Sequence, residues 1–190
     1  MLRKSLRISI LLECFALVCL AAPAQQVIHA IVGTISSVDP VAKTFAVNRD
    51  NDSPAYFKFS ANSKTSVDFD KNARTDVSAA AEFKKSGARV IVYYFGDGDV
   101  LTAVGLRSLQ AGTVTKIAGT VVKLDKRKHL LTIAAKSGVT ESFEITQNTV
   151  AETGMGAVEG LKFQPEEGDQ VRVTASQASG NEIALFINAA

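Results

Sequence analysis

The sequence is poor in the side chains that carry metal, redox and nucleophilic chemistry. It holds two cysteines, two histidines, two methionines and no tryptophan among 190 residues. Cys14 and Cys19 both lie in the amino-terminal stretch that contains the one long apolar run. If that stretch is removed, the remaining chain has no cysteine, which excludes disulfides, cysteine metal sites and thiolate catalysis.

The first 24 residues have the composition of a secretory signal peptide. Arg3, Lys4 and Arg7 form a basic start, an apolar run follows over 8–20, and Ala22-Pro23-Ala24 supplies small residues at a cleavage point. The run is short for a bilayer span, which needs about 20 apolar residues. We therefore expect a signal peptide over 1–24, no transmembrane anchor in the mature chain, and a periplasmic or extracellular location after cleavage near Ala24.

Removal of this peptide makes the mature chain neutral. Lys plus Arg falls from 21 to 18 because three basic residues leave, and Asp plus Glu falls from 19 to 18 because Glu13 leaves. A neutral domain has no long-range field that gathers phosphates, so we expect no nucleic-acid partner. The basic run over 126–129 is expected to be a solvated turn, with weak contact to a polyanion as the alternative.

A pattern of apolar residues and glycine occurs twice, 86 positions apart. Three stretches of the first copy recur in the second: Ile31-Val32-Gly33-Thr34-Ile35 as Ile117-Ala118-Gly119-Thr120-Val121, Phe45-Ala46-Val47 as Leu131-Thr132-Ile133, and Phe57-Lys58-Phe59 as Phe143-Glu144-Ile145. Self-similarity at a fixed period indicates repeated modules. We expect a first module over 28–107 and a second over 113–190.

The first strand of each module is predicted to be bent. Apolar residues alternate with period two over 31–35, as in a half-buried strand, and then shift phase at Val38. The second copy repeats the shift, which predicts a β-bulge near Ser36-Ser37 and another near Val122-Lys123. The glycine before each bulge leaves room for a barrel strand to curl.

Five strands are predicted in each module. The last two cover 87–92 and 101–106 in the first copy, and 168–173 and 182–187 in the second. The alanine-rich segment from Asp76 to Lys85 predicts a short helix between strands three and four of the first module. This order predicts an all-β fold of two tandem five-stranded OB-like small barrels.

The shared layout is Gly-Thr-[Ile/Val] and Asp, then Phe-x-[Phe/Ile], Gly-x-x-Val-x-Val and a terminal Ala-x-x-[Leu/Ile]. It resembles a family of bacterial secreted small β-barrel domains of unknown function, present here as two tandem copies over nearly all of 28–190. The resemblance implies a barrel fold and a location in the cell envelope. It implies no catalytic residues.

One loop partly matches a calcium site. Residues 68–76 place oxygen-bearing side chains at the first, third, fifth and ninth positions of a calcium loop. Ala73 stands where the sharp turn needs glycine, and Ala79 stands where a bidentate glutamate is needed. We therefore expect a solvated loop without an ion.

Other cofactor and catalytic patterns are incomplete. A copper site needs methionine and histidine together, and the mature chain offers only Met155, His29 and His129, far apart in sequence. The run Gly154–Gly160 imitates a dinucleotide loop, but its third glycine comes one place late. No Gly-x-Ser-x-Gly motif occurs. We expect no metal, no cofactor and no enzymatic activity.

The outward face of the fourth strand differs between the copies. Apolar residues of the first module replace polar ones of the second: Ile91, Tyr93 and Phe95 correspond to Arg172, Thr174 and Ser176, and Leu101 corresponds to Glu182. An apolar strip of this size is rarely left in water. It is expected either to pack on the second module or the inserted helix, or to bind an envelope protein or a second copy of the chain.

These observations lead to two functional hypotheses. The first is a non-catalytic secreted or cell-envelope protein that acts by protein–protein contact, through Ile91, Tyr93, Phe95 and Leu101, or as a structural module. The alternative is binding of a small ligand or an oligosaccharide by a barrel face or in the cleft between the modules.

Overall fold

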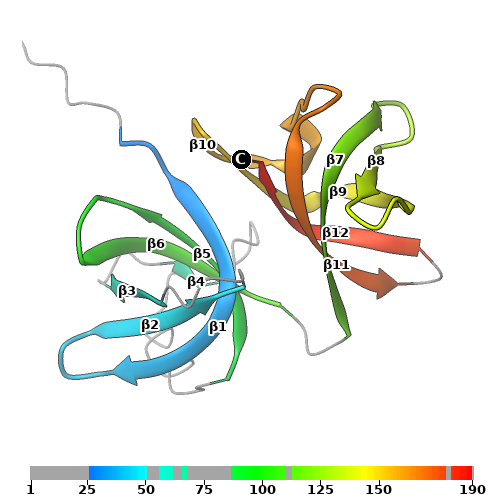
Figure 1. Ribbon diagram of the computed structural model, residues 1–190. Coiled ribbons are helices and arrows are strands. Elements are labelled where there is room, and N and C mark those ends of the chain that lie inside the picture. Colours follow the sequence, from blue (N-terminus) through cyan, green and yellow to red (C-terminus); the bar gives the residue numbers. More distant parts are fainter. Residues whose placement is uncertain are drawn as a thin grey trace, which may run out of the picture.

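The computed structural model describes residues 26–50, 56–61, 66–67, 87–109, 113–178 and 181–189. In this part of the chain, strands form two sheets, each of which closes on itself into a barrel (Figure 1). The predicted signal peptide, the predicted helix over 76–85 and the whole loop over 68–76 lie outside the described residues. Within those ranges no helix is long and apolar enough to cross a membrane.

Barrel one contains five main strands and one short additional strand. Their bounds are β1 (His29–Asp39), β2 (Thr44–Arg49), β3 (Tyr56–Ser60), β4 (Ser66–Val67), β5 (Arg89–Phe95) and β6 (Val100–Ser108). β1 pairs antiparallel with β2 and β5, and the parallel pairing of β3 with β6 closes the ring. The short β4 also runs parallel to β6.

Barrel two repeats this connectivity. Its elements are β7 (Val114–Asp125), β8 (Leu130–Ala135), β9 (Thr140–Thr153), β10 (Gly156–Glu159), the 3₁₀ turn η1 (Gly160–Lys162), β11 (Gln170–Ala178) and β12 (Asn181–Ala189). β7 pairs with β8 and β11, and the parallel pairing of β9 with β12 closes the ring. A first strand between the second and fourth, with the third parallel to the fifth, is OB-type topology. The predicted all-β fold of two five-stranded OB-like barrels is confirmed.

Both predicted bulges are present. The register of β1 on β2 shifts between Ile35 and Ser37, and that of β7 on β8 shifts between Val121 and Lys123. Each first strand therefore changes the side that its residues face, which allows it to bend around a small barrel.

The turn after the first strand has the same side-chain hydrogen bonds in both barrels. The carboxylate of Asp39 accepts from the N–H groups of Val41 and Ala42, and that of Asp125 accepts from the two equivalent N–H groups. These bonds, chiefly the one from the Lys128 backbone, lower the pKa of Asp125 below its ordinary value. Lys43 and His129 end the two turns with positive φ angles of 54° and 52°.

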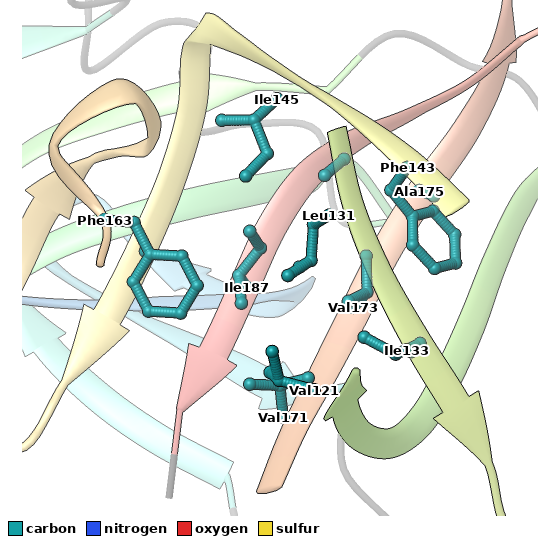
Figure 2. Close-up of a cluster of buried hydrophobic side chains, with 12 residues drawn as sticks. Val121, Leu131, Ile133, Phe143, Ile145, Phe163, Val171, Val173, Ala175 and Ile187 are labelled. Carbon is teal, nitrogen blue, oxygen red and sulfur yellow. The ribbon is translucent and has the colours of Figure 1, made fainter. Parts of the chain in front are cut away.

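Each barrel has its own apolar interior. The interior of barrel one is built from buried residues of its five main strands: Ile31, Ile35, Phe45, Val47, Phe59, Val90, Val92, Leu101, Ala103 and Leu106. Figure 2 shows the equivalent cluster of barrel two, where Leu131, Phe143 and Val173 lie among the strands. Val90 and Val92 face the interior of barrel one, and Val171 and Val173 face that of barrel two.

Candidate site at the junction between the barrels

The apolar strip predicted on β5 is largely covered by barrel two. Ile91 is fully buried in a cluster with Ala30 and Val32 of β1, Val150 of β9 and Phe186 of β12. Tyr93 packs against the same cluster, and burial raises the pKa of its hydroxyl above the ordinary value. Ile91 and Tyr93 therefore join the two barrels.

The placement of Leu101 on this outward strip was wrong. Leu101 is 6% exposed and lies in the interior of barrel one, where β6 places it opposite Phe59. Side chains alternate along a strand, so Leu101 faces the same way as Ala103, two residues later. The apolar residue at this position therefore belongs to the interior of barrel one and not to an outer strip.

Phe95, the last member of the predicted strip, lies at the end of β5 and is half-buried. It is opposite Thr102 of β6, two residues after Val100, which is 46% exposed. Lys58 of β3 pairs with Val100 on the other side, and Tyr56 precedes it by two residues with 68% of its surface exposed. We call Tyr56, Phe95 and Val100 the outer flank of barrel one.

Glu152 of β9 connects barrel two to the first strand of barrel one. One carboxylate oxygen lies 2.7 Å from Nδ1 of His29, and the other accepts from the backbone N–H of Ala30 over 2.7 Å. The side chain of Glu152 is 13% exposed. A carboxylate at this short distance acts as the acceptor, which places the proton on Nδ1 and leaves Nε2 of His29 without a proton in the neutral ring.

Aromatic rings continue from this contact into the mouth of barrel one. The rings of His29 and Tyr94 lie 5.8 Å apart, and Tyr94 meets Phe59 edge-on at 5.4 Å. Burial, and then the charge of Glu152, raise the pKa of Tyr94 above its ordinary value, while the charge of Arg49 opposes them. The ring of His29 therefore lies between Glu152 and Tyr94. The guanidinium of Arg49, 5.9 Å above the ring of Phe57, is near enough for its charge to act on the Tyr94 hydroxyl.

A second polar contact joins the barrels at the start of β7. Asp50 of barrel one bonds both to Arg89, at the start of β5, and to Nζ of Lys116, the latter over 3.0 Å. The side chain of Asp50 is 10% exposed, so its charge is compensated within the protein. Lys116 occupies the position in barrel two that Ala30 occupies in barrel one.

The three residues considered for copper lie on different elements. His29 starts β1, His129 lies in the turn between β7 and β8, and Met155 lies in the turn between β9 and β10 with 90% of its surface exposed. In the part of the chain that the structure describes, no three His, Cys, Asp or Glu side chains form a group that could hold a metal ion.

Sequence reasoning missed the role of Glu152 and His29. The two residues are 123 positions apart, and no periodic pattern connects them. Glu152 belongs to a part of β9 where the two copies diverge, so the repeat offered no counterpart to compare. β9 is mostly polar and holds two further glutamates, Glu141 and Glu144, so its composition did not single out Glu152.

No family model and no curated protein sequence matches the chain. Similar solved structures include apo-CusF from Escherichia coli, at 15% identity and TM-score 0.34 over 47% of this chain and 95% of that one. CusF–Ag(I) from the same organism has 15% sequence identity and a TM-score of 0.34, over 47% of this chain and 100% of that one. The Drosophila Unr fragment CSD456 has 13% sequence identity and a TM-score of 0.32, over 85% of this chain and 61% of that one. At these scores the similarities support no inference about ligand or activity.

Proposed function

We propose that the chain is a non-catalytic protein of the cell envelope that acts as a two-barrel structural and contact module. The observation that supports this proposal is how the apolar strip is divided. Ile91 and Tyr93 fasten barrel one to barrel two, whereas Phe95 continues into an outer flank whose Tyr56 and Val100 stay exposed. Fixing the barrels together gives that flank a rigid support, as a contact surface requires.

The outer flank has the composition of a contact surface. Tyrosine and phenylalanine are enriched at the centres of protein interfaces, where they bury a large area with few rotatable bonds. Lys58 lies between Tyr56 and Val100 and adds one positive charge beside the uncharged outer flank. We expect the partner to be another envelope protein or a second copy of this chain.

The test uses the mature chain beginning at Gln25. The double variant Tyr56→Ser, Val100→Ser should lose a cross-linked envelope partner, or fall to a lower mass in light scattering, with its thermal midpoint unchanged. Val41→Ser is the matched control, because Val41 is 94% exposed in the turn after β1. Unchanged mass and unchanged cross-links in the double variant would refute the contact role.

A second function is favoured by one specific observation, the contact of the His29 and Tyr94 rings at 5.8 Å within reach of the charge of Arg49. A cation near aromatic rings suits an acidic sugar, because the rings can pack on its apolar face and the cation can attract its carboxylate. Titration with an oligogalacturonate should shift the amide and side-chain resonances of these three residues. Shifts spread evenly over the surface, or none, would exclude this site.

A further inference from the structure

Residues 27–30, which lead into β1 and form its first two positions, contact barrel two through the backbone. The N–H of Ala157 in β10 donates to the carbonyl of Ile28 over 2.7 Å. β10 pairs with β9 on its other side, so this bond occupies the edge that β9 leaves open. We infer that residues 27–30 are an amino-terminal strap, which docks on barrel two and makes the two barrels one cooperative unit.

Gly156 shows that the hairpin of β9 and β10 is shaped to receive the strap. A Cβ atom on Gly156 would lie 2.6 Å from Cγ1 of Val27 and 2.7 Å from the carbonyl oxygen of Ile28, both too close for real contacts. Its φ of 109° also disfavours any side chain. Gly154, in the same hairpin, would meet nothing within 4 Å. The close approach is therefore specific to the glycine beneath the strap.

Glu152 holds the other end of the strap. Its carboxylate takes hydrogen bonds from two successive residues, the His29 ring and the Ala30 backbone. Ala30 is fully buried in the cluster that Ile91 and Phe186 form between the barrels. The strap therefore combines a backbone bond at β10, two bonds to one carboxylate and burial of apolar surface, all between the two barrels.

The first half of the strap, residues 27–28, is separable from the closure of either barrel. The pairing of β1 with β5 begins at His29 and Tyr94, so residues 26–28 form none of the ladder pairs of barrel one. The ring of barrel two is closed by its own strands. Removing residues 25–28 therefore removes the Ile28 acceptor and Val27 while both barrels keep all their main pairings.

The experiment compares the mature chain beginning at Gln25 with a chain beginning at His29. Amide hydrogen exchange at Ala157 should become at least about tenfold faster in the shorter chain, because a backbone bond and its cover are lost. Calorimetry should show one transition for the longer chain and two for the shorter. Glu152→Ala should act in the same direction, with Glu141→Ala, on the same strand, as its control.

The glycine pair compares a position beneath the strap with one in open space, and making Gly156→Ala in both chains separates the lost contact from the strain that its φ places on any side chain. Gly156→Ala should accelerate exchange at Ala157 and split the transition, whereas Gly154→Ala should change neither. If the chain that begins at His29 keeps the exchange rate at Ala157 and a single transition, the strap has no role in coupling the barrels. If Gly154→Ala and Gly156→Ala behave alike, the contact with Val27 and Ile28 does not determine the coupling.

Discussion

At the scale of the residue, Gly33 and Gly119 determine where the first strand of each barrel bends. A Cβ atom on Gly33 would run into the backbone oxygen of Asn48, and one on Gly119 would run into the equivalent oxygen of Ala134. The second strand therefore crosses the first more closely than any side chain would allow. The equivalence of these two contacts is the structural counterpart of the repeat in the sequence.

Gly119→Ala is expected to lower the free energy of unfolding by about 2 kcal/mol, the usual cost of forcing extra atoms into a packed position. Neither neighbour is the end of a flexible side chain, so relief requires the backbone of β8 to move. Urea denaturation measures the change. Gly154→Ala is the control, because its Cβ meets open space, and an equal loss in both variants would contradict the explanation.

At the scale of the element, the turns that follow β1 and β7 contain a non-glycine residue in a left-handed conformation. His129 has a φ of 52° and an exposed side chain. The left-handed region costs such a residue roughly 1–2 kcal/mol. Replacing the residue with glycine removes this strain, but it also raises the entropy of the unfolded chain, so only part of the cost is recovered. The turn is therefore formed at a cost that the two Asp125 hydrogen bonds help to offset.

His129→Gly is expected to raise the free energy of unfolding by about 0.5 kcal/mol, the difference between the relieved strain and the added chain entropy. Arg127→Gly, in the same turn but with no positive φ, should instead lower it, because only the entropy term applies. The urea midpoints of the two variants should move in opposite directions. A fall in both midpoints would mean that the left-handed residue is not strained.

Elements with a local pattern could be predicted from the sequence. The phase change after Ile35 predicted the bulge, and the basic run over 126–129 predicted a turn, because both effects act within a few residues. Leu101 was misplaced because it was compared with Glu182 at the aligned position, whereas its own alternation with Ala103 decides its facing. The Glu152 contacts with His29 and Ala30 could not be predicted, since they depend on how two barrels meet.

At the scale of the whole molecule, the junction cluster gives each barrel an apolar contact outside its own interior. Modules of about 80 residues bury a marginal core by themselves. Ile91 and Phe186 are almost completely buried although both lie outside the two barrel interiors. Mutual packing therefore adds stability that neither closed ring supplies alone, and it couples the unfolding of one barrel to that of the other.

Phe186→Ala tests this coupling. Truncating a buried phenylalanine costs about 3 kcal/mol, and here the loss falls on the contact between barrels instead of on an interior. Calorimetry of the variant should resolve two transitions in place of one. Leu101→Ala, which opens the interior of barrel one, should destabilise the protein comparably while the junction stays intact. If Phe186→Ala still unfolds in one transition at a lower temperature, the barrels are coupled by the strap and the Asp50–Lys116 pair rather than by this cluster.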